Sequence, residues 1–165
     1  MSRGFVKEDD QEETPIIPPR AALPAGVINY VTAVGLQELK TELEELDHTI
    51  TTLDEQDERE RRRSLAVLNG KRNVLVERIQ SARLLEKVKD TEEIRFGAFV
   101  TYTIGSRQVT IQIVGVDEAD VAKQKISFTA PIARTLIGKK LNERVSFKIG
   151  NEMRAITIKN IEYPK

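Results

Sequence analysis

The stretch "LQELKTELEELDHTITTL" at residues 36–53 decides the fold, because its leucine and isoleucine residues recur at alternating intervals of three and four. This spacing places the apolar side chains on one face of an α-helix and is typical of a coiled coil. A second apolar seam follows, interrupted at Arg72. Two helices with one apolar face each are stable when these faces pack together, so the sequence predicts an antiparallel helical hairpin over residues 31–90. The seams consist of Leu36, Leu39, Leu43, Leu46, Ile50 and Leu53, and of Leu68, Leu75, Ile79 and Ala82.

The tip of this hairpin is expected near "DEQDERERRR", residues 54–63, which lie midway between the outer ends of the two seams. The dipeptide Asn69-Gly70 is a competing turn signal, but a turn there would give arms of unequal length. With the earlier turn, Gly70 lies inside the second helix at a cost of about 1 kcal/mol. Thr32 is the expected N-cap of the first helix.

Residues 1–30 are rich in proline and acidic residues. Proline fixes the backbone and removes a hydrogen-bond donor, so we expect an extended or disordered tail here. On this interpretation the tail is separable from the folded core, and its removal leaves the melting temperature nearly unchanged.

From residue 91 to residue 165 the apolar pattern changes to a period of two, which is typical of β-strands. Two strands joined around Gly105-Ser106 predict a β-hairpin, and Pro131 and Gly138 bracket one short helix. Together they predict a small α+β domain. The expected strands are 94–104, 107–115, 125–128, 144–150 and 154–163, and the expected helix is 130–140.

The composition excludes several classes of site. The chain has no cysteine, which excludes disulfides, zinc–thiolate centres and thiol chemistry. Its single histidine, His48, has no partner pattern for nucleophilic catalysis. We expect a cytoplasmic protein without membrane contact, since neither an export signal nor a long apolar run is present. Residues 31–60 are acidic and residues 94–165 basic, which indicates either a directional electrostatic partner or pairing within the protein.

Several strings resemble a known family. The segments "FGAFVT" (96–101), "IVGVDEAD" (113–120), "APIARTLIGKK" (130–140) and "IEY" (161–163) closely resemble the C-terminal domain of the bacterial Gre transcript-cleavage factors, GreA and GreB. The segment "VTAVGLQELKTELEEL" (31–46) resembles the start of their coiled coil. The first 30 residues have no counterpart in those factors.

The resemblance implies an FKBP-like C-terminal domain that binds core RNA polymerase at the rim of its secondary channel, while the coiled coil enters the channel. Acidic residues at the tip would help to hold a second Mg²⁺ in the polymerase active site, where backtracked RNA is cleaved. The chain would then be a monomeric accessory factor rather than an enzyme. It would hold no cofactor alone and would meet nucleic acid only through the polymerase. The implied catalytic carboxylates are Asp57 and Glu60; candidates for the shared Mg²⁺ are Asp54, Glu55, Asp57, Glu58 and Glu60; candidates for partner binding are Asp117, Glu118, Asp120, Pro131, Ile132 and Arg134.

The sequence departs from the family pattern at the tip. The family motif is Gly-Asp-x-x-Glu-Asn, and here Gln56 and Arg61 replace the flanking glycine and asparagine. The coil is also shorter by roughly one heptad per arm, or about 10 Å of reach. A non-cleaving channel occupant of the Rnk type therefore remains an alternative to cleavage stimulation. A third alternative is an unrelated coiled-coil adaptor or prolyl isomerase. The tip acids could equally form a solvated helix end balanced by the adjacent arginines.

Overall fold

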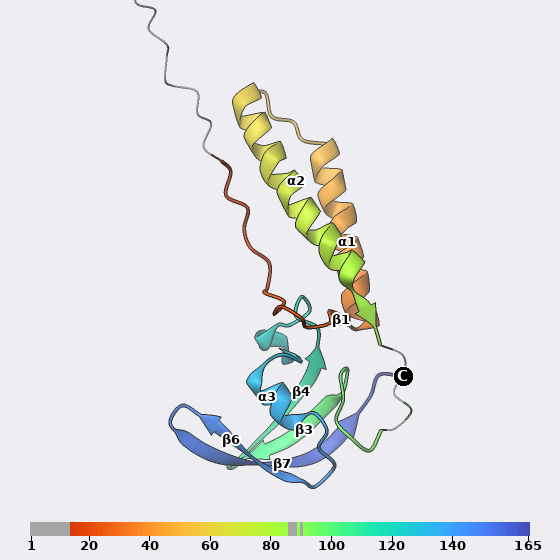
Figure 1. Ribbon diagram of the computed structural model, residues 1–165, viewed down its shortest axis with the longest axis vertical. Helices are drawn as coiled ribbons and strands as arrows, with labels where there is room; N and C mark the ends of the chain where they lie inside the picture. Colours follow the sequence, from red (N-terminus) through yellow and green to blue (C-terminus); the bar gives the residue numbers. More distant parts are fainter. Residues whose placement is uncertain (1–13, 86–88, 90) are drawn as a thin grey trace, which may run out of the picture.

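The computed structural model describes residues 14–85, 89 and 91–165. A helical hairpin stands above a curled β-sheet domain, and an extended N-terminal segment runs beside the hairpin to the point where the two parts meet (Figure 1). The expected α+β class, with a helical hairpin followed by a small sheet domain, is confirmed.

The hairpin consists of α1 (Ala33–Thr51) and α2 (Glu58–Ser81). Residues 52–57 connect the helices, and α2 runs unbroken through Gly70. Its core has three buried residues, Val31, Leu39 and Leu75. The seam residues Leu36, Leu43, Leu46, Ile79 and Ala82 pack against them. Where Arg72 interrupts the seam, its Nε donates a hydrogen bond to Asp47 Oδ1 across the hairpin at 2.6 Å. The polar interruption is therefore an ion pair between the helices.

The C-terminal domain is a five-stranded mixed sheet in the order β5-β4-β3-β7-β6. Strands β3 and β4 form the predicted hairpin, with Gly105 in its turn at φ 59°. Strand β5 pairs parallel with β4, and β6 pairs antiparallel with β7. Helix α3 (Pro131–Leu136) packs on the sheet through Ala133 and Leu136. The strands are β3 (Phe99–Ile104), β4 (Arg107–Val114), β5 (Lys125–Ser127), β6 (Arg144–Ile149) and β7 (Glu152–Glu162), and the 3₁₀ helix η1 is Val121–Lys123.

The N-terminal segment contacts the body of the molecule. Residues 14–29 contain no helix or strand, as expected of extended chain, and the separability of the tail stays a prediction. Arg20 pairs with side chains of both α1 and the C-terminal domain. Strand β1 (Tyr30–Val31) then pairs parallel with β2 (Arg83–Leu84) at the base of the hairpin. Residues 1–13 of the expected tail lie outside the described residues.

Candidate functional site

The loop at the hairpin tip uses its own carboxylates as hydrogen-bond acceptors. Asp54 Oδ1 accepts from Gln56 Nε2 at 2.5 Å, and Glu55 Oε1 accepts from the Asp57 backbone N–H at 3.2 Å. Asp57 Oδ1 in turn accepts from the Glu60 backbone N–H at 2.9 Å. Three of the five candidate magnesium ligands therefore help to shape the turn.

The Asp57-x-x-Glu60 spacing has a structural explanation. Asp57 is the N-cap of α2, and Glu58 and Glu60 lie in its first turn. Acidic side chains are favoured there because they accept hydrogen bonds from free backbone N–H groups and face the positive end of the helix dipole. Glu60 Oε1 also lies 3.8 Å from Arg63 Nη1. The pattern that predicts metal ligands is thus also the pattern that starts a helix.

The tip does not provide a complete metal site. Within the described part of the chain, no three His, Cys, Asp or Glu side chains converge closely enough to hold an ion. Magnesium prefers six oxygen ligands and keeps several waters, with one or two carboxylates supplied by a protein. The side chains of Glu58 and Glu60 are exposed and accept none of the loop hydrogen bonds described above, so the tip can offer carboxylates of this kind to an ion held mainly by a partner.

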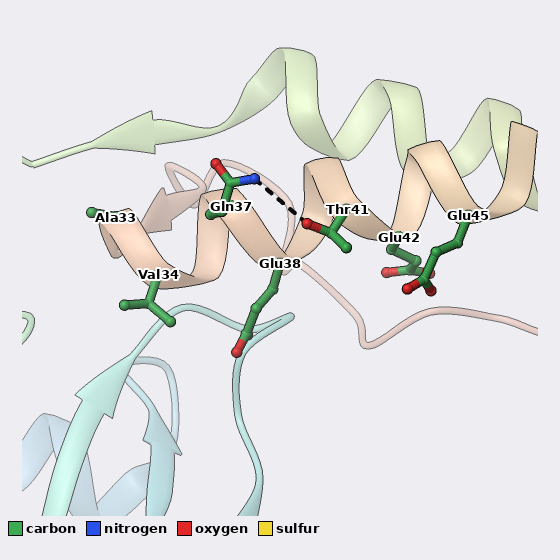
Figure 2. Close-up of a pocket in the computed structure, with 7 residues that line it drawn as sticks. All are labelled: Ala33, Val34, Gln37, Glu38, Thr41, Glu42 and Glu45. Atoms are coloured by element: carbon green, nitrogen blue, oxygen red, sulfur yellow. Dashed lines mark hydrogen bonds between the residues drawn. The ribbon is translucent and has the colours of Figure 1, made fainter.

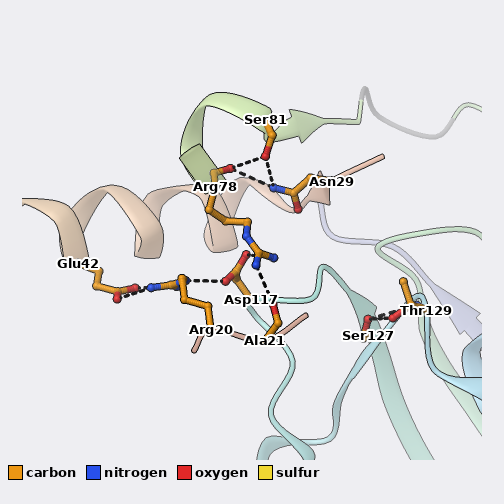
Figure 3. A network of polar contacts seen from close by, with 9 residues as sticks. All are labelled: Arg20, Ala21, Asn29, Glu42, Arg78, Ser81, Asp117, Ser127 and Thr129. Carbon is orange, nitrogen blue, oxygen red and sulfur yellow. Dashed lines mark hydrogen bonds and ion pairs between the residues drawn. The ribbon is translucent and has the colours of Figure 1, made fainter. Parts of the chain in front are cut away.

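The loop after β4 differs from the expected docking surface. Figure 3 shows Asp117 between two arginines, and only 5% of its side chain is exposed. Arg20 Nε donates to Asp117 Oδ1 at 3.0 Å. Arg78 Nη1 lies 3.2 Å from Oδ2, an ion pair without hydrogen-bond geometry. The charge of Asp117 is therefore neutralised inside the molecule, and its role in partner binding stays a prediction.

Glu118 is also buried and bonded within the molecule. Thr32 Oγ1, the N-cap of α1, donates to Glu118 Oε2 at 2.5 Å, and Lys125 Nζ donates to Oε1 at 3.2 Å. A Cβ added at Gly35 would lie 2.5 Å from Glu118 Oε2. The glycine thus permits the close approach of this carboxylate to the first turn of α1.

The remaining candidates for partner binding are more accessible. Asp120 caps η1 through the Ala122 backbone N–H, and 41% of its side chain is exposed. Pro131 and Arg134 of α3 are exposed, whereas Ile132 packs on the domain core. The N-cap residue of α3, Ala130, makes no side-chain cap hydrogen bond. Of the six predicted residues, Asp120, Pro131 and Arg134 are therefore the ones that a partner can reach.

An open groove lies along the first turns of α1, on the side that faces the C-terminal domain (Figure 2). The exposed Val34 and Glu38 point toward the loops of that domain, while Gln37 Nε2 donates to Thr41 Oγ1 at 3.5 Å. Acidic side chains border the groove at its far end.

Sequence reasoning missed the residues that join the two parts of the molecule. Arg20 Nη1 and Nη2 donate to Glu42 Oε1 and Oε2 at 2.7 and 3.1 Å, and this hydrogen bonding raises the pKa of the guanidinium despite its partial burial. Arg78 Nη2 donates to the Ala21 carbonyl at 2.7 Å. Asn29 Nδ2 donates to the Arg78 carbonyl at 3.0 Å. An arginine inside the expected tail was the one available signal.

Comparisons with known proteins agree with this architecture. The family model described as "Transcription elongation factor, GreA/GreB, C-term" matches residues 89–163. The transcription elongation factor GreB of Neisseria meningitidis serogroup A is 32% identical over 165 residues, covering 83% of this chain and 95% of that protein. The chain belongs to the GreA/GreB family of transcription elongation factors. This confirms the resemblance seen in the sequence, and the family comprises accessory factors rather than enzymes.

Other family members match a smaller part of the chain. GreA of Syntrophotalea carbinolica is 41% identical over 75 residues, covering 44% of this chain and 48% of that protein. GreA of Legionella pneumophila strain Corby is 33% identical over 98 residues. The chain spans between 48% and 61% of the length of these two relatives. The structure of the GreA factor homolog Gfh1 of Thermus thermophilus covers 81% of this chain at 20% identity, with a TM-score of 0.39.

No helix within the described residues is both long and apolar enough to cross a lipid bilayer.

Proposed function

We propose that this protein regulates transcription elongation by binding RNA polymerase at the secondary channel and inserting the hairpin tip. Family membership over most of the chain, together with an acidic hairpin mounted on the family's C-terminal domain, carries the proposal. The C-terminal domain would contact the polymerase through Asp120, Pro131 and Arg134. The hairpin would bring the exposed Glu58 and Glu60 toward the catalytic Mg²⁺. The protein would act in the cytoplasm as a monomer.

Two activities are compatible with such an insertion. In the first, tip carboxylates complete the ligands of a shared Mg²⁺, which would activate water for cleavage of backtracked RNA. In the second, the tip occupies the channel and modulates nucleotide addition without cleavage. The engagement of Asp54, Glu55 and Asp57 within the loop favours the second activity, because bonded carboxylates have fewer free oxygen lone pairs.

A cleavage assay on a backtracked complex separates these activities. The assay uses the cognate polymerase, labelled RNA and saturating full-length factor. The test variant is Asp57→Asn with Glu60→Gln, which removes two charges but keeps an N-cap at the start of α2, since asparagine caps as well as aspartate. The control is Glu44→Gln with Glu77→Gln, which removes two charges from exposed positions of α1 and α2 outside the tip.

If the tip supplies ligands, cleavage by the wild type and the control exceeds that of the test variant by at least tenfold, while all three bind equally. If wild-type factor binds without stimulating cleavage, the ligand activity is wrong and the channel-occupant activity stands. Failure of the wild type to bind core polymerase contradicts the proposed function as a whole.

A further inference from the structure

We propose that residues 14–29, here called the strap, fix the helical hairpin in one orientation on the C-terminal domain. The contacts of the Arg20 side chain make the main connection, which is called the clasp below. The proposal concerns the direction in which the hairpin tip points relative to the C-terminal domain. It goes beyond polymerase binding and does not depend on it.

The need for a clasp follows from the two separate hydrophobic cores. The hairpin core is built around Leu39 and Leu75, whereas the domain core lies between the sheet and α3. A shared core would fix the angle between the two parts, but these cores have no residue in common. Besides the strap, the described residues connect the two parts through the Thr32–Glu118 hydrogen bond, through the Arg78–Asp117 ion pair, and through contacts of the Tyr30 ring with Phe96 and Phe128 at 5.9 and 5.7 Å. Because these contacts all lie at the base of the hairpin, we expect the strap to add resistance to rotation of the hairpin.

Arg20 connects three parts of the molecule with one guanidinium group (Figure 3). Its Nη atoms bind both carboxylate oxygens of Glu42 on α1, and its Nε binds Asp117 of the C-terminal domain. Bidentate arginine–carboxylate pairs fix geometry as well as charge. Only 21% of the Arg20 side chain and 5% of the Asp117 side chain are exposed, so salt screens this connection less than it screens a surface pair.

The strap also packs along α2, and its contact with Gly70 is called the seat below. The Ala21 carbonyl accepts from Arg78, and Ile17 packs against Gly70, where an added Cβ would overlap the Ile17 side chain. From Arg78 to Gly70 the helix rises about 12 Å at 1.5 Å per residue. The four residues from Ala21 to Ile17 cover this length at about 3 Å each, which is the rise of an extended chain. A helix-destabilising glycine inside α2 is thus explained as the seat of the strap.

Distance measurements between spin labels test the clasp in the full-length chain. The protein contains no cysteine, so labels at Ala66→Cys on α2 and Lys148→Cys on β6 are unique, and both positions are exposed. We expect one narrow distance distribution in the labelled parent. Arg20→Met keeps the aliphatic stem but removes the clasp, and should broaden the distribution at least twofold. The matched control is Arg72→Met, which breaks an ion pair inside the hairpin only.

A second variant tests the seat independently of Arg20. Gly70→Ala should lengthen or broaden the distance between labels at Ile16→Cys and Ala66→Cys, because the added methyl group displaces Ile17. Asn69→Ala, the neighbouring exposed position of α2, should not. Circular dichroism confirms that each variant is folded. The clasp is wrong if Arg20→Met leaves the Ala66–Lys148 distribution narrow, if Arg72→Met broadens it equally, or if Gly70→Ala leaves the strap distance unchanged.

Discussion

At the scale of single residues, the carboxylate of Asp57 can be explained in two ways, as a helix cap and as a metal ligand. Its spacing from Glu60 matches the family's tip motif, yet its Oδ1 accepts the Glu60 backbone N–H and caps α2. Substitutions that remove the side chain therefore affect folding and any metal binding together. Substitutions that remove only the charge separate the two roles.

We accordingly expect Asp57→Ala to lower the free energy of unfolding by about 1 kcal/mol, the usual effect of losing an N-cap. Asp57→Asn should change it by only a few tenths of that amount, because the amide oxygen still accepts the bond. Urea denaturation followed by circular dichroism measures both, with Arg59→Ala, at an exposed position in the first turn of α2, as a neighbouring control. Equal destabilisation by asparagine and alanine would show that the charge at the helix dipole matters, and not the cap.

At the scale of elements, the first turn of α1 is where the hairpin and the C-terminal domain fit most tightly. Thr32 caps the helix and also donates to Glu118, and Gly35 leaves room for that carboxylate. The start of α1 is therefore shaped by Glu118, a residue of the C-terminal domain.

Gly35→Ala tests this fit. Inside an ordinary helix the change stabilises by up to about 1 kcal/mol, because alanine has the higher helix propensity. Here the added Cβ meets Glu118, so we expect a net destabilisation of about 1–3 kcal/mol, as for other overpacked sites. Thermal or urea unfolding gives the sign, and Gln37→Ala on the exposed face of α1 is the control. A stabilising Gly35→Ala would mean that Glu118 swings away freely.

The helices and strands also show which parts of the structure could be predicted from the sequence. The spacing of apolar residues by three and four predicted both helices, and their alternation with a period of two predicted the strands. Such patterns can be seen in the sequence because they involve residues that are close together in the chain. The burial of Asp117 was not predicted, because an acidic loop in a sequence looks like an exposed surface. Its partner Arg20 lies 97 residues away in the chain, and no local pattern reveals such a pair. The strap was missed for the same reason.

At the scale of the whole molecule, the separate cores differ in size. The C-terminal core contains ten buried residues, whereas three are buried in the hairpin core. Regions with few buried apolar contacts open at lower free energy than the rest of a protein. The hairpin is therefore expected to open locally while the sheet domain stays folded. The strap, the ion pairs of Asp117 and the Thr32–Glu118 hydrogen bond connect the two parts.

Leu75→Ala tests this hierarchy, because Leu75 is fully buried in the smaller core. Truncating a buried leucine costs about 2–5 kcal/mol, through lost transfer free energy and the cavity that remains. Native-state hydrogen exchange should show faster exchange of the amides of α1 and α2, while those of β3 and β7 keep their protection. The converse variant, Ile158→Ala in the fully buried part of β7, should speed exchange in the sheet. If Leu75→Ala speeds exchange equally in the hairpin and the sheet, the two cores unfold as one cooperative unit. The contacts of Arg20 and Asp117 would then couple the stability of the hairpin to that of the sheet domain, in addition to fixing the orientation of the hairpin.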